Sequence, residues 1–200
     1  RSSAGYPLAL PLSVANDVLL AAEVPDETAD ADLRSKLEGN GTNRFLVRVD
    51  RNYTTSLSDW SDPGAPVEFD NTVVVTSPTQ PLLTLNPGLR LVFRAGKSLD
   101  LGDGAVGRGS LLVNGDPAGE TVVTIGPVSA EEGWAGIRVR PASSLRATGA
   151  FEVSGPADTA AAMDVEGAFV SLDGTRINGQ GRGTGLRSRG EGSDVAIVNA

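Results

Sequence analysis

The chain has 200 residues, among them 25 glycines and 12 prolines, and it contains neither cysteine nor histidine. Without those two residue types it can form no disulfide, no Ser-His-Asp triad and no histidine-ligated zinc site. A formal net charge of −8 disfavours nucleic acid as a partner, because phosphate binding requires a basic surface.

Residues 1–60 differ from the rest and are expected to form an N-terminal capping or docking segment. Residues 6–20 are apolar and interrupted by proline, which is typical of an extended segment. Residues 26–38 have the pattern of a short helix, with acidic residues in the first turn and Gly39 placed to end it. Residues 45–50 alternate as a strand does. A solenoid needs a cover over its open end that differs from its repeats, and this segment would supply it.

From residue 73 onward, short apolar-alternating segments fall into three tracks separated by glycine- and proline-rich corners. The first track comprises Val73/Val75, Leu99/Leu101, Ile137/Val139, Met163/Val165 and Leu186. The second comprises Leu83/Leu85, Leu111/Val113, Leu145/Ala147, Val170/Leu172 and Val195/Ile197. The third comprises Leu91/Phe93, Val123/Ile125, Phe151/Val153 and Thr175/Ile177. Three strands per turn and about five turns predict an all-β fold, a right-handed parallel β-helix over residues 61–200.

Charges at the outward positions alternate when the first-track segments are stacked as neighbouring strands. Unlike charges directly opposite each other stabilise a strand pair and like charges destabilise it, so this alternation supports the register that the apolar positions indicate. We therefore expect a structural charge ladder. Its first row is Asp100, Arg138, Asp164 and Arg187, its second row is Arg140, Glu166 and Arg189, and the third track adds Glu152 opposite Arg176.

Four segments carry a resemblance to a known family. They are residues 83–88 (LTLNPG), 91–93 (LVF), 109–115 (GSLLVNG) and 133–137 (GWAGI). Over residues 70–200 the chain resembles bacterial right-handed parallel β-helix repeat proteins of the pectin-lyase-like fold, although Ala162 occupies a position where the family has isoleucine or valine. The resemblance implies the fold and an extracellular or cell-surface location. It implies no particular activity, because many such proteins have none assigned.

Five residues are candidates for binding a ligand. Trp134 could stack on a sugar ring, while Arg138, Asp164, Glu166 and Arg187 together imitate the acidic and basic cluster of a Ca²⁺-dependent polysaccharide lyase. The structural alternative makes Trp134 part of a core layer and the other four part of the ladder. Paired arginines lower the pKa of a carboxyl group, which suits a ladder better than a general acid. We therefore predict no catalytic residue, metal ligand or cofactor.

The sequence favours a non-catalytic β-helix scaffold, or an adhesion or ligand-presenting domain, of a secreted or cell-surface bacterial protein. Its expected partner is a polysaccharide or another surface protein, without membrane insertion. Two alternatives remain open: a carbohydrate-active enzyme, a polysaccharide lyase more than a hydrolase, and a self-assembling structural subunit. Residues 195–200 are apolar, so we expect a solenoid truncated at its C-terminus, with end-to-end self-association through the open last turn.

Overall fold

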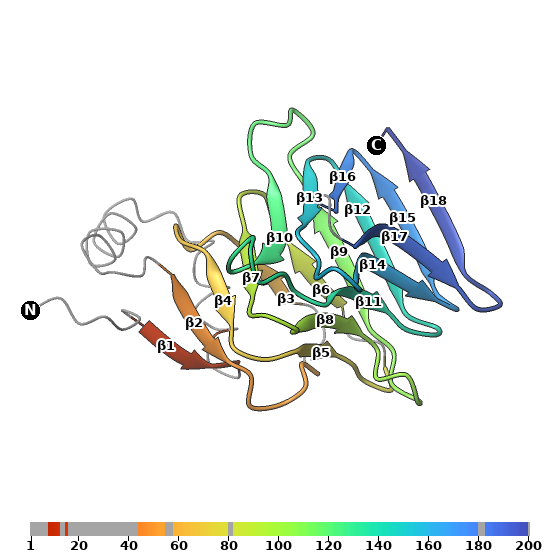
Figure 1. The fold of residues 1–200 in the computed structure, drawn as a ribbon, viewed down its shortest axis with the longest axis horizontal. Helices are drawn as coiled ribbons and strands as arrows, with labels where there is room; N and C mark the ends of the chain where they lie inside the picture. The colour runs from red at the N-terminus through yellow and green to blue at the C-terminus, as the bar shows by residue number, and fades with distance from the viewer. Residues whose placement is uncertain are drawn as a thin grey trace, which may run out of the picture.

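The structure is a computed structural model that describes residues 8–12, 15, 44–54, 58–79, 82–179 and 183–199. Its strands form three sheets in which neighbouring strands run parallel, and successive turns of the chain follow one another from the N-terminal to the C-terminal end (Figure 1). The described residues contain no helix that is both long and apolar enough to span a lipid bilayer.

From residue 58 onward successive strands of the chain belong to sheets C, A and B in turn, which makes the fold a parallel β-helix. Sheet A consists of β1 (Leu8–Pro11), β2 (Phe45–Arg48), β4 (Val67–Phe69), β7 (Arg90–Phe93), β10 (Val123–Pro127), β13 (Phe151–Ser154) and β16 (Thr175–Asn178). Sheet B consists of β5 (Val73–Val75), β8 (Ser98–Leu101), β11 (Gly136–Val139), β14 (Ala161–Glu166) and β17 (Thr184–Arg189). Sheet C consists of β3 (Ser58–Trp60), β6 (Leu82–Leu85), β9 (Ser110–Asn114), β12 (Ser144–Thr148), β15 (Phe169–Asp173) and β18 (Asp194–Val198). The fold class predicted from the sequence is confirmed, with six strands in sheet C where five turns were expected.

The solenoid begins before residue 61. Phe45 of β2 pairs with Val67, and Ser58 of β3 pairs with Leu83, both in parallel register. Between them Tyr53 forms a parallel bridge to Val75 at the edge of sheet B. Residues 45–48 and 58–60 therefore belong to the sheets of the β-helix, which reaches further towards the N-terminus than the predicted start at residue 61. The helix expected over residues 26–38 lies outside the described residues.

The predicted register is correct in sheets B and C and is shifted at one place in sheet A. Leu91 lies opposite Ile125, and Phe93 lies opposite Pro127, two residues away from the predicted pairing with Val123 and Ile125. A shift of two residues keeps every side chain on the same face of a strand, so the apolar alternation cannot distinguish the two registers. Leu89 is buried just before β7, and its carbonyl oxygen accepts a hydrogen bond from the N–H of Thr124.

A column of aromatic rings lies in the core of the N-terminal half. Tyr53 meets Trp60 edge to face at 5.6 Å between ring centroids, and the column continues by stacking through Phe69 and Phe93. Trp134 ends it, with its ring stacked on Phe93 at a centroid distance of 5.1 Å. Aromatic pairs of this kind contribute about 0.5–1.5 kcal/mol beyond their buried area.

Candidate functional site

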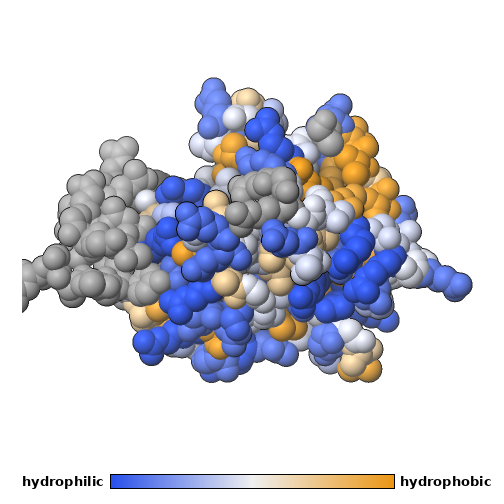
Figure 2. Space-filling view, in the orientation of Figure 1, coloured by the Kyte–Doolittle hydropathy of each residue, from blue (hydrophilic) through white to orange (hydrophobic). Residues whose placement is uncertain are grey.

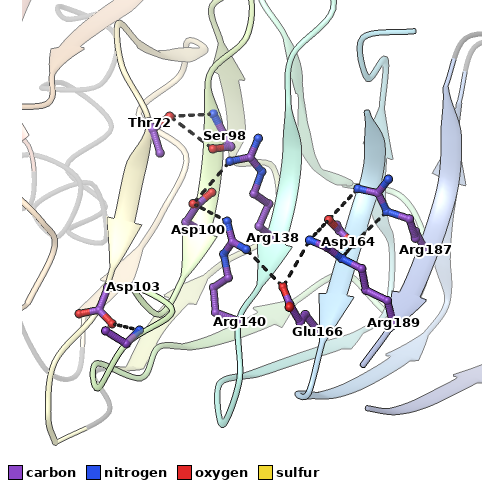
Figure 3. Close-up of polar contacts among 11 residues, drawn as sticks. Thr72, Ser98, Asp100, Asp103, Arg138, Arg140, Asp164, Glu166, Arg187 and Arg189 are labelled. Carbon is purple, nitrogen blue, oxygen red and sulfur yellow. Dashed lines mark hydrogen bonds and ion pairs between the residues drawn. The ribbon is translucent and has the colours of Figure 1, made fainter. Parts of the chain in front are cut away.

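The two predicted rows of the ladder that belong to the first track lie on the outer face of sheet B (Figure 3). In the register of that sheet Arg138 lies between Asp100 and Asp164, and Arg187 lies beyond Asp164 on the edge strand β17. Alternate residues of the same strands point inward, which leaves the charged ones on the solvent side. The polar face is thus a direct consequence of the strand alternation that builds the core.

Asp164 is the centre of the network. Arg187 donates two hydrogen bonds to it, Nε to Oδ1 at 3.1 Å and Nη2 to Oδ2 at 2.7 Å. Arg189 donates a second pair to the same two oxygens, at 3.3 and 3.2 Å. The Asp164 side chain is only 8% exposed, whereas those of Arg187 and Arg189 are 46% and 49% exposed. Two guanidinium groups on the solvent side therefore cover one nearly buried carboxylate.

This arrangement shifts the pKa values of the groups involved. Burial by itself raises the pKa of Asp164, but the hydrogen bond and charge of Arg187, together with those of Arg189, outweigh it and hold that pKa below its usual value. The hydrogen bond and charge of Asp164 in turn raise the pKa of Arg187. Asp164 is therefore ionised at neutral pH.

Ion pairs extend from Asp164 across four strands. Arg189 also forms an ion pair with Glu166 at 3.3 Å. Arg140 forms one ion pair with Glu166 at 3.4 Å and another with Asp100 at 3.7 Å. Arg138 completes the network through a longer contact of 3.8 Å with Asp100. The ladder is thus continuous from β8 to β17, and each of its three carboxylates has at least one arginine beside it.

Two pairs of unlike charges that lie opposite each other in register do not form ion pairs. Arg138 lies opposite Asp164, yet within the described residues no ion pair joins them, because both oxygens of Asp164 already accept hydrogen bonds from the arginines of β17. Glu152 and Arg176 also lie directly opposite each other in sheet A, and the described part of the chain shows no ion pair between them. Register brings unlike charges together, and side-chain conformation decides which of them pair.

Trp134 cannot serve as a surface platform for a sugar ring. Its side chain is fully buried, its ring stacks on Phe93, and its Nε1 donates a hydrogen bond to the carbonyl oxygen of Ser154 at 2.7 Å. Of the two interpretations that the sequence left open, burial favours the core layer. The candidate ligand surface is therefore reduced to the charged residues of sheet B.

A second charged cluster, which the sequence analysis did not single out, lies on sheet A. Glu68 of β4 is 1% exposed and receives the Nε of Arg94 at 2.8 Å and the Nη1 of Arg44 at 3.5 Å. Arg44 also donates to the carbonyl oxygen of Val128. The spacing of about one coil between the three residues would have revealed this cluster, but the predicted tracks began only at residue 73.

Two acidic loops, one containing Asp103 and the other containing Asp116, hold their turns through their own carboxylates. Asp103 accepts hydrogen bonds from the N–H groups of Ala105 and Gly107, and Asp116 accepts them from those of Ala118, Glu120 and Thr121. The hydrogen bond from the N–H of Ala105 is the main cause of the lowered pKa of Asp103, and the one from the N–H of Ala118 is the main cause of the lowered pKa of Asp116. In the described part of the chain no three acidic side chains converge as metal ligands.

Comparison with protein-family models, with curated proteins and with solved structures finds no match to this chain. The parallel β-helix that the resemblance implied is present, and membership of the family stays a prediction. The fold and the geometry of the sheet B ladder are therefore what bears on function.

Proposed function

We propose that this chain is a non-catalytic β-helix scaffold that presents a ligand-binding face, in a secreted or cell-surface protein. The observation that carries the proposal is the pairing of Asp100, Asp164 and Glu166 with arginines on sheet B. A general acid needs a carboxyl group whose pKa is raised towards neutrality. The pKa of Asp164 is shifted the opposite way, which suits a group that holds neighbouring strands in register.

The same face supports a role in binding an anionic carbohydrate. Its four arginines remain partly exposed, from 27% for Arg140 to 49% for Arg189, on a rigid sheet. Four arginines against the three carboxylates give a local charge of +1 on a chain whose net charge is −8. Attraction of an anionic ligand would therefore be local and would decrease with added salt.

The test combines an array of neutral, uronic-acid and sulfated glycans with turnover assays on pectate, alginate and glycosaminoglycans, with and without Ca²⁺. We expect binding to acidic glycans without formation of unsaturated products. Arg138→Gln should weaken that binding while the fold survives, because Arg138 makes only one long contact in the ladder, with Asp100. Arg146→Gln, on the exposed face of β12, is the matched control and should leave glycan binding unchanged. Product formation that Asp164→Asn abolishes would overturn the proposal.

A further inference from the structure

The sheet B ladder contains the same group twice, two arginines that converge on one recessed aspartate. In the first group Arg138 and Arg140 of β11 both contact Oδ2 of Asp100, at 3.8 and 3.7 Å. In the second group the two arginines of β17 both donate hydrogen bonds to Asp164 (Figure 3). The aspartates are only 13% and 8% exposed, whereas the arginines are between 27% and 49% exposed. Each group therefore turns guanidinium groups towards solvent and carries one more positive charge than negative.

The two groups are two strands apart. Arg138 lies opposite Asp100 on one side and opposite Asp164 on the other, so the two aspartates occupy one row of the sheet with β11 between them. Neighbouring strands are about 4.8 Å apart, which separates equivalent points of the two groups by about 9.6 Å. Hydrophilic side chains predominate over β14 and β17 in the space-filling view, whereas apolar ones gather at the upper right (Figure 2).

An acid lies between the two groups. Glu166 of β14 forms ion pairs with Arg140 of the first group and with Arg189 of the second, at 3.4 and 3.3 Å, and its side chain is 38% exposed. Across the strands this face is therefore positive, then negative, then positive again. A ligand anion placed midway between the groups would meet the like charge of Glu166, whereas a neutral part of the ligand would not.

On the basis of the function proposed above, we propose that the ligand of this face is a polysaccharide in which acidic sugars alternate with neutral ones, lying across the strands of sheet B. A sugar ring advances an extended polysaccharide by about the spacing of neighbouring strands, so the two groups are two sugars apart. The acidic sugars pair with the guanidinium groups, and a hydroxyl group of the neutral sugar between them donates a hydrogen bond to Glu166. A polyuronate places a carboxylate at that middle position and is disfavoured.

The probes are two unsulfated octasaccharides. In the hyaluronan octasaccharide glucuronate alternates with neutral N-acetylglucosamine, whereas in the oligogalacturonate octasaccharide every sugar is acidic. Attraction by total charge favours oligogalacturonate, which has twice as many carboxylates, so the two explanations predict opposite orders of affinity. In isothermal titration calorimetry with the whole chain, we expect hyaluronan to bind about threefold more tightly or better, with both affinities decreasing as salt is added.

Glu166→Gln tests the acid between the groups. It removes the like charge, so oligogalacturonate should bind this variant about threefold more tightly than the wild-type chain, or better, and hyaluronan should gain less. The fold should survive, because the arginines keep their contacts with Asp100 and Asp164. Glu152→Gln, on the outer face of β13, is the matched control and should change neither affinity.

The outcomes separate this inference from the function on which it rests. Tighter binding of oligogalacturonate to the wild-type chain, or an equal gain of both octasaccharides from Glu166→Gln, would overturn the alternation and leave a carbohydrate-binding face in place. Binding of neither octasaccharide would also overturn the alternation. If the glycan array then shows no acidic glycan bound either, the proposed function is overturned as well.

Discussion

Asp164 binds Arg187 and Arg189 but not its neighbour Arg138, which allows two contrasting double-mutant cycles on the same carboxylate. The first cycle combines Asp164→Asn with Arg187→Gln, and the second combines it with Arg138→Gln. Arg187 makes two charge-assisted hydrogen bonds to Asp164, at 2.7 and 3.1 Å. Arg138 lies directly opposite in register but pairs with Asp100.

The expected magnitudes follow from exposure and geometry. Exposed ion pairs contribute about 0.2–1 kcal/mol, and a paired fork on a nearly buried carboxylate strengthens the interaction, so we expect a coupling of about 1–2 kcal/mol between Asp164 and Arg187. For Arg138 we expect less than about 0.5 kcal/mol, the level at which substitutions are additive. The ladder as a whole then specifies strand register more than it adds to the free energy of unfolding.

The assay is urea denaturation of the wild-type chain, the single variants and the two double variants, followed by circular dichroism. Equal slopes of the free energy against urea concentration establish that the unfolded states are comparable. A coupling for Arg138 as large as that for Arg187 would refute the reasoning, because register alone would then decide which charges interact. A zero coupling for both would show that the guanidinium groups on β17 are too exposed to matter.

Three further predictions concern the core, a close backbone contact and acid. Trp134→Ala should lower the free energy of unfolding by about 3–5 kcal/mol, because it empties a core position, whereas Val106→Ala on an exposed loop should change it by less than about 0.5 kcal/mol in the same urea titration. A methyl group at Gly109 would clash with the backbone carbonyl oxygen of Val75, so Gly109→Ala should lower the melting temperature strongly. Gly185→Ala is the control, since its nearest contact would be an ordinary 3.5 Å, and equal losses would contradict the close approach. The lowered pKa of Asp164 means that its ionised form stabilises the fold above the unfolded-state pKa of about 3.9, and that this contribution is lost as pH falls through the lower folded value. The stability difference between wild type and Asp164→Asn should therefore shrink in titrations from about pH 7 to about pH 3, and a constant difference would contradict it.

The alternation of apolar and polar residues by itself determined the three tracks and their register in sheets B and C, since a shift of one residue would bury the ladder's charges. It also placed Asp100, Arg138, Asp164 and Arg187 in one outward row. These are local properties of each strand, repeated from coil to coil, so a single sequence is enough to reveal them.

Only the tertiary structure decided the features that depend on competition between neighbours. The register of β7 against β10 differs from the prediction by two residues, a shift that leaves the alternation unchanged. Arg138 contacts Asp100 because arginines from the far side occupy Asp164, and no strand pattern encodes that choice. The burial of Trp134 depends on Phe93 of β7, which lies one coil earlier in the chain. Strand periodicity specifies which face a side chain takes, whereas packing in three dimensions selects its partner.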